Sequence, residues 1–122
     1  MEDIYRRIYG KMDRMGVFGI RQYAIIEKPP FVTLCIDLIS EDCYALSQNK
    51  VIDGFMVADP DMEIRIDHLR KTAEPLAYQD RTERKVVYPE PGKVNLRVKN
   101  DLASILERWL DDLLSQGFIY HQ

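Results

Sequence analysis

The sequence predicts an α+β domain with a helix near each end of the chain and a mainly antiparallel sheet between the two helices. Apolar residues recur at helical spacing near the start of the chain and over a longer stretch near its end. Between these stretches, short runs of β-branched and aromatic residues alternate with turn-forming clusters. Because the runs have short connections, we expect four to six antiparallel strands, with the C-terminal helix packed on the sheet.

Length and composition predict a single domain over residues 1–122. A chain of 122 residues that is 46% hydrophobic and 30% charged can bury one ordinary hydrophobic core. Neither end carries an apolar segment long enough to span a membrane or direct export, and the two cysteines show no metal-site spacing. We therefore expect a cytoplasmic protein with reduced thiols and no membrane partner.

The first helix is expected near the start of the chain. Its apolar residues recur at intervals of four, four and three, which places them on one stripe: Ile4, Ile8, Met12 and Met15. Gly16 follows directly and is suited to the left-handed conformation that ends many helices.

Five strands are predicted, over residues 19–28, 31–39, 51–57, 62–68 and 84–88, whereas residues 40–50 are expected to contain turns. Pro29 and Pro30 end the first strand, because proline cannot donate a ladder hydrogen bond. Two helices are too few to cover both faces of such a sheet. We expect the second face to be solvated or to bind a partner or a second copy of the chain.

The last helix has a wide apolar stripe, formed by Val98, Leu102, Ile105, Leu106, Trp109, Leu110 and Leu113. Asn100 is expected to be its N-cap. Gly117 is expected to end the helix and to place Phe118 against Leu113.

The segment DPDMEIRIDH, residues 59–68, has four carboxylates and a histidine, a composition typical of metal and acid/base sites. Strand alternation separates them: one face would hold Asp59, Asp61, Glu63, Arg65 and Asp67, and the other Met62, Ile64 and Ile66, with His68 in line behind them. The acidic row would extend over about 26 Å, too far for a single ion. We expect a solvated strand whose other face builds the core, although Asp61 and Glu63 remain a local pair suited to binding a cation with other ligands.

Three functions are open. The preferred one is a non-catalytic protein-interaction or regulatory module, in which a protein partner or a weak homodimer uses some of the seven tyrosines. The first alternative is a small enzyme with a polar cleft near Asp67 and His68, although neighbouring strand residues point to opposite faces. The second is nucleic-acid binding through the basic stretch 65–99, which a net charge of −3 disfavours.

Residues 55–118 resemble the YqiB-like family of uncharacterised bacterial proteins. The resemblance lies in the pair Asp67 and His68 on a strand, Tyr88 with Pro89, and a closing helix with Trp109, Leu110 and a terminal Gly117. The order of the Asp-His pair is reversed in this chain. The resemblance implies a helix–sheet–helix layout and assigns no catalytic residue.

The candidate binding residues are charged or aromatic side chains of the C-terminal half: Arg65, Asp67, His68, Arg70 and Tyr88. Carboxylate, imidazole and guanidinium groups together can move a proton and hold an anion. The sequence has no glycine-rich phosphate loop, nucleophile elbow or HExxH motif. We therefore expect no catalytic residue, no metal ligand and no cofactor.

Overall fold

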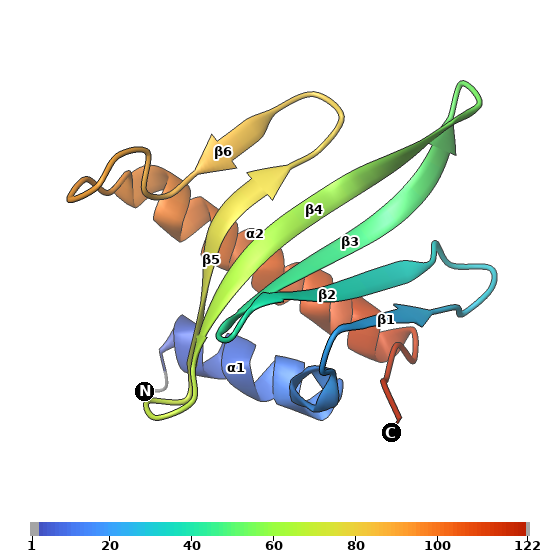
Figure 1. Cartoon of the computed structure of the whole chain (residues 1–122), viewed down its shortest axis with the longest axis horizontal. Coiled ribbons are helices and arrows are strands. Elements are labelled where there is room, and N and C mark those ends of the chain that lie inside the picture. Colours follow the sequence, from blue (N-terminus) through green and yellow to red (C-terminus); the bar gives the residue numbers. More distant parts are fainter. Residues whose placement is uncertain (1–2, 122) are drawn as a thin grey trace.

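A six-stranded sheet carries both helices on one of its faces (Figure 1). The computed structural model of the chain describes residues 3–121. Helix α1 (Ile4–Arg14) and helix α2 (Leu96–Ser115) pack on each other, and both contact the same strand of the sheet. The predicted α+β fold is confirmed, including the C-terminal helix packed on the sheet.

The sheet is an antiparallel meander in which each strand pairs with the next in sequence. Its strands are β1 (Tyr23–Ile26), β2 (Leu34–Ser40), β3 (Cys43–Ile52), β4 (Phe55–Asp67), β5 (Thr72–Gln79) and β6 (Arg84–Val86). A short 3₁₀ helix, Val17–Gly19, connects α1 to the sheet.

Two strands differ from the prediction. Residues 43–52 form β3 rather than turns, because the chain reverses later, at Asp53 and Gly54, which both take positive φ. The expected strand 51–57 is therefore the tip of the β3–β4 hairpin. Strand β5 was missed because it contains Pro75, which lies at a β-bulge opposite β4, where a lost ladder hydrogen bond is tolerated.

The residues that begin and end α2 are identified by their hydrogen bonds and backbone angles. Asn95, not Asn100, caps α2: its side-chain oxygen accepts a hydrogen bond from the Val98 amide at 3.1 Å. The prediction of Asn100 was wrong, because the residues before it continue the helix by one more turn, back to an asparagine with extended backbone. The other end agrees with the prediction: Gly117 has a φ of 88°, and the Phe118 amide donates to the Leu113 carbonyl at 3.0 Å.

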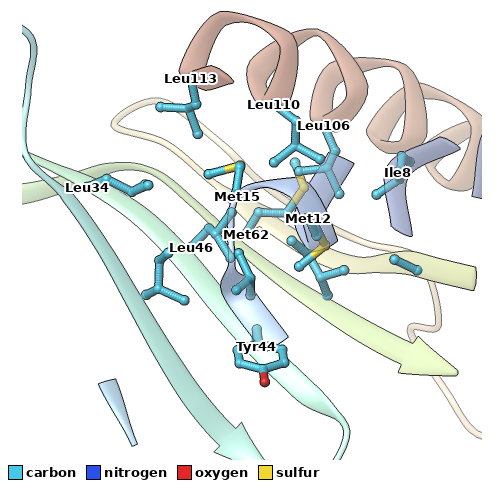
Figure 2. Close-up of a cluster of buried hydrophobic side chains, with 14 of the residues drawn as sticks. Ile8, Met12, Met15, Leu34, Tyr44, Leu46, Met62, Leu106, Leu110 and Leu113 are labelled. Carbon is cyan, nitrogen blue, oxygen red and sulfur yellow. The ribbon is translucent and has the colours of Figure 1, made fainter. Parts of the chain in front are cut away.

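The core lies between the helices and the sheet. Figure 2 shows side chains of both helices meeting side chains of the central strands. Fully buried members of this cluster include Ile8, Met12, Leu106 and Leu110 from the helices and Leu34, Leu46 and Met62 from the strands. Alternate residues of β4 enter this core, as the sequence predicted, since Met62, Ile64 and Ile66 are all buried.

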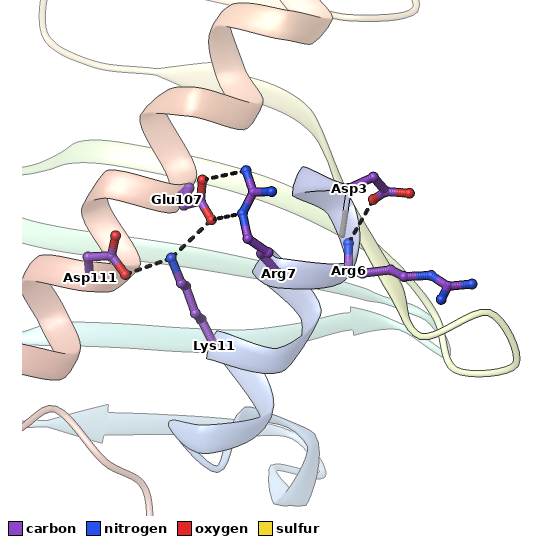
Figure 3. Close-up of polar contacts among 6 residues, drawn as sticks. All are labelled: Asp3, Arg6, Arg7, Lys11, Glu107 and Asp111. Atoms are coloured by element: carbon purple, nitrogen blue, oxygen red, sulfur yellow. Dashed lines mark hydrogen bonds and ion pairs between the residues drawn. The ribbon is translucent and has the colours of Figure 1, made fainter. Parts of the chain in front are cut away.

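An ion-pair network joins the two helices beside the core (Figure 3). Glu107 of α2 accepts hydrogen bonds from Arg7 at 2.8 Å and 3.1 Å and from Lys11 at 3.0 Å. Lys11 also lies 2.8 Å from Asp111. Hydrogen bonds from Arg7, together with those from Lys11, lower the pKa of Glu107 from 4.5 to about 2. The network therefore fixes the packing of α1 on α2.

Among residues 3–121, no helix is both long enough and apolar enough to span a membrane.

Candidate functional site

The five candidate binding residues lie near the turn that joins β4 to β5, but they do not all lie on the same side of the sheet. Arg65 and Tyr88 meet at Glu74 of β5: the guanidinium of Arg65 lies 2.9 Å from its carboxylate, and the Tyr88 hydroxyl donates to the carboxylate at 2.8 Å. Lys99 of α2 lies 3.2 Å from the other carboxylate oxygen. Glu74 thus joins the sheet to α2.

Glu74 was missed by the sequence reasoning because its strand was missed. In the sequence the available signal is the alternation of small or apolar Ala73 with the polar residues Thr72 and Glu74, and in the structure Ala73 is buried while both neighbours are half-buried. The flanking Pro75 concealed that signal.

Asp67 and Arg70 form the turn between β4 and β5. The Asp67 carboxylate accepts a hydrogen bond from the Arg70 amide at 3.0 Å, and the Arg70 guanidinium lies 3.8 Å from the same carboxylate. Both side chains therefore stabilise a local turn.

His68 lies on the helix side of the sheet. Its Nδ1 is 2.8 Å from the Tyr9 hydroxyl of α1, and its ring meets Phe18 edge-on with centroids 4.9 Å apart. Asp67 and His68 accordingly hydrogen-bond to different elements, as alternation along the strand predicted. The geometry does not bring this acid and this imidazole together on one atom.

An open groove of about 680 Å³ runs along this end of the sheet, and both Asp67 and His68 line it. Each of its two guanidinium groups already has a carboxylate partner in the groove, since Arg65 pairs with Glu74 and Arg70 lies near Asp67. Glu41 and Asp42 also line the groove, so its carboxylates outnumber its guanidinium groups and it offers little attraction for an anionic ligand.

The sheet face opposite the helices, hereafter the open face, is crossed by two rows of residues that run through all six strands. The first row consists of Tyr23, Asp37, Ala45, Glu63, Ala77 and Val86, and the second of Ile25, Cys35, Ser47, Asp61, Gln79 and Arg84. No described helix covers these rows (Figure 1).

Three carboxylates dominate the centre of the open face, and we call them the acidic strip: Asp37, Asp61 and Glu63. None of the ion pairs among the described residues includes them. Burial raises the pKa of the Asp61 carboxyl, and the neighbouring charges of Glu63 and Asp37 raise it further. The charge of Arg84 acts on the pKa of Asp61 in the opposite direction, but no ion pair among the described residues includes the strip, which is therefore a concentration of negative charge.

The acidic row predicted from Asp59 to Asp67 is wrong at its first member. Asn49 pairs with Ala58 and Ser47 pairs with Asp61, so that Asp59 and Pro60 both lie opposite a single residue of β3. This β-bulge interrupts the alternation, and Ala58 rather than Asp59 continues the face of Asp61. Within residues 3–121, no group of three or more His, Cys, Asp or Glu side chains is arranged to hold a metal ion.

The edge strand β1 adds apolar surface beside the acidic strip. The exposed fractions of Tyr23 and Ile25 are 63% and 60%, and both belong to the rows of the open face. A second apolar surface lies at the tip of the β3–β4 hairpin, where Val51, Phe55 and Met56 are also exposed.

Comparison with known proteins identifies a family and no characterised relative. Residues 3–119 match the family described as DUF6908, a domain of unknown function. The chain belongs to this family. The DUF6908 match covers both helices and all six strands, so the groove and the open face both lie within the family's domain. No curated protein and no solved structure matches the chain. The resemblance to the YqiB-like family stays a prediction.

Proposed function

We propose that this domain is a non-catalytic protein-interaction module that binds a different protein on its open face. The observation that carries the proposal is the placement of both helices on one face of the sheet, which leaves an acidic strip and exposed apolar residues on the other.

The composition of the open face supports a protein partner. Tyr23 and Ile25 expose most of their surface on a strand that has a neighbour on one edge only among the described residues. Aromatic side chains are enriched at protein interfaces, and a free strand edge can accept a strand from another chain. Side chains that point away from the core here are thus available for recognition.

A different protein fits the open face better than a second copy of the chain. A two-fold dimer whose axis passes through the centre of this face would place the acidic strip of one copy opposite that of the other. Like charges that face each other across an interface destabilise it. The weak homodimer predicted from the sequence is therefore not the form that we propose.

The basic stretch 65–99 gives less support to nucleic-acid binding. Many of its cations pair with carboxylates of the same stretch: Arg65 and Lys99 with Glu74, Lys85 with Glu83, and Lys93 with Glu90. Cations that are already paired release fewer counterions on binding to phosphates, which weakens the main source of affinity for nucleic acid.

The proposal places the domain in the cytoplasm. Cys35 and Cys43 are both free, and free thiols persist in a reducing compartment.

The test compares three versions of the full chain: wild type, a variant with Tyr23→Ser and Ile25→Ser, and a control with Val51→Ser and Met56→Ser. The control removes two exposed apolar side chains from the hairpin tip instead of the open face. A partner captured by the wild type from a lysate of the source organism is identified, purified and titrated calorimetrically against all three. Circular dichroism checks that each version is folded.

We expect the control to bind the purified partner as the wild type does and the open-face variant to bind it at least about tenfold more weakly, since a few buried aromatic and apolar contacts dominate interface energies. Equal affinity of all three versions would contradict the proposal. Light scattering provides a second criterion. If the wild type is a dimer and the open-face variant is a monomer, the partner is a second copy of the chain.

A further inference from the structure

We propose that the partner protein adds an extended segment to the free edge of β1, antiparallel to β1, as a further strand of the six-stranded sheet. This inference rests on the proposed function and names how the partner binds and what it brings. The segment carries apolar side chains at alternate positions, and its main-chain N–H groups at those positions bond to β1.

The hydrogen-bond pattern of β1 leaves main-chain groups unpaired at this edge. The Leu38 amide donates to the Gln22 carbonyl at 2.8 Å, so Gln22 faces β2. Alternate residues of an antiparallel strand bond to the same neighbour, and Ala24 therefore faces β2 as well. The N–H and C=O groups of Tyr23 and Ile25 point the other way, to the free edge. An added strand would pair with these groups.

The same two residues present their side chains on the open face. Tyr23 and Ile25 expose most of their surface, whereas Ala24 between them is buried. Residues directly opposite each other in an antiparallel pair have side chains on the same face of the sheet. A segment that bonds to the main chain of Tyr23 and Ile25 thus places every second side chain beside theirs. Apolar residues are favoured at those positions, because they remove apolar surface from water.

The two edges of the sheet differ in their protection. Strand β6 carries Arg84 and Lys85, and directly after it the Asn95 amide donates to the Val87 carbonyl at 2.7 Å. Charged residues and covering segments prevent other strands from adding to an edge. Strand β1 has no charged residue, no proline and no register shift against β2. The free edge of β1 is therefore the one suited to accept a strand.

A flexible segment of another protein fits this edge better than a second copy of β1. Two copies joined here would meet over strands of four residues each. Stable interfaces bury about 1,200 Å² or more, which two such short strands do not reach. A flexible segment can follow the edge beyond β1 and also cover the side chains of Tyr23 and Ile25.

The probe for this edge is a blocked peptide of sequence Lys-Thr-Ile-Thr-Tyr-Thr-Lys, titrated into the ¹⁵N-labelled full chain. Two N-methylated versions of the peptide have the same composition and the same side chains. In the first, the methyl groups lie on the isoleucine and tyrosine nitrogens, which should face β1. In the second, they lie on the two threonines that flank the tyrosine, whose nitrogens should face away from β1.

The protein versions are wild type, Ile25→Ala and Ile25→Pro. Both variants remove the isoleucine side chain, but only proline also removes the N–H group that points to the edge. Proline is tolerated on an edge strand where its nitrogen faces away from the ladder. Circular dichroism checks that each version is folded. If Ile25→Pro does not fold, the comparison of the two methylated peptides decides alone.

In the free chain, we expect rapid hydrogen exchange of the Tyr23 and Ile25 amides and slow exchange of the Ala24 amide. The unmethylated peptide should bind with a dissociation constant of about 1 mM or tighter and slow the exchange at Tyr23 and Ile25. Methylation of its isoleucine and tyrosine should weaken binding at least about tenfold, because two hydrogen bonds are lost, and methylation of its threonines by less than about twofold. Ile25→Pro should bind the unmethylated peptide more weakly than Ile25→Ala.

Equal binding of the two methylated peptides, equal binding by Ile25→Ala and Ile25→Pro, or no binding of the unmethylated peptide would each overturn the inference. Exchange of the Tyr23 amide that slows as the concentration of the free chain rises would also overturn it, because a second copy would then occupy the edge.

These outcomes are distinct from failure of the proposed function. The purified partner could lose affinity for the variant with Tyr23→Ser and Ile25→Ser and yet bind Ile25→Pro as well as Ile25→Ala. In that case the open face is the interface, and the partner adds no strand to β1.

Discussion

The indole N–H of Trp109 donates a hydrogen bond to the side-chain oxygen of Gln48 at 3.0 Å and thereby ties α2 to β3. The amide nitrogen of Gln48 donates in turn to the Val32 carbonyl at 3.0 Å. One half-buried glutamine therefore connects the C-terminal helix, the centre of the sheet and the segment that leads into β2. It also helps to hold β3 in the position that creates the open face.

Replacement of Gln48 by alanine should lower the free energy of unfolding by about 1–2 kcal/mol, because it leaves the indole donor and the Val32 carbonyl without this partner. Trp109 is the only tryptophan of the chain, so tryptophan emission reports on the surroundings of this one indole, of which Gln48 is part. We expect a change in emission in the folded state and a lower denaturation midpoint. Gln22→Ala on the exposed loop before β1 is the control, and similar curves for the two variants would contradict the role given to Gln48.

Glu107→Gln should destabilise the protein by about 1–2 kcal/mol at neutral pH, because a carboxylate that accepts from Arg7 and Lys11 loses its charge. The folded-state pKa of Glu107, about 2, lies below the ordinary 4.5. Its stabilising contribution is therefore complete above pH 4.5 and is lost as the pH falls from 4.5 towards 2.

The measurement for Glu107 is the difference in unfolding free energy between wild type and variant as a function of pH. The difference should be constant near neutrality and shrink below pH 4.5. Glu90→Gln serves as control, because Glu90 pairs with Lys93 at an exposed site and should contribute little. A difference that does not vary between pH 6 and pH 3 would be inconsistent with the ion-pair network.

Gly16→Ala should cost more stability than Gly54→Ala. Both glycines have a φ near 80°, which costs an alanine about 1–2 kcal/mol. A methyl group on Gly16 would also clash with the carbonyl oxygen of Tyr120, whereas nothing lies within 4 Å of one on Gly54. We expect a loss of about 3 kcal/mol at Gly16 and about 1 kcal/mol at Gly54 in thermal unfolding. Equal losses would show that the Tyr120 contact is not maintained.

Asp61→Asn should leave stability unchanged or raise it at neutral pH. Burial and the charges of Glu63 and Asp37 raise the pKa of Asp61 above 3.8, so its ionised form is less favourable in the folded chain than in the unfolded one. The wild type should gain from protonation of Asp61 as the pH falls through that raised pKa. Asp67→Ala is the opposite case, because it removes the side-chain oxygen that accepts the hydrogen bond from the Arg70 amide in the turn. Destabilisation by Asp61→Asn as large as by Asp67→Ala would indicate a structural role for Asp61.

The helices and the buried side of β4 could be predicted from the sequence because each depends on local periodicity. The stripe from Ile4 to Met15 and the alternation of Met62, Ile64 and Ile66 need no knowledge of distant residues. The bulge at Asp59 and Pro60 could not be predicted, since it depends on how β3 pairs with β4. Strand β5 was obscured by Pro75, whose tolerance likewise depends on a bulge.

The candidate site also has features that local sequence predicts and features that depend on how distant segments pair. Opposite orientations of Asp67 and His68 followed from strand geometry alone. The meeting of Arg65, Tyr88 and Lys99 at Glu74 joins segments far apart in sequence, and the acidic strip requires the register that places Asp37 beside Ala45 and Glu63. Asp61 and Glu63 were recognised as a possible cation-binding pair, but their third member became visible only with the sheet.

The most direct test of the open face as an interface is site-specific photo-cross-linking in cells of the source organism. A photoreactive phenylalanine analogue replaces Tyr23, an exposed aromatic residue of the open face, or, in a separate version, Arg108 on the exposed side of α2. The account predicts an adduct with one different protein from position 23, reduced when Ile25→Ser is added, and none from position 108. An adduct from position 108 alone, or an adduct of two copies of this chain from position 23, would contradict it.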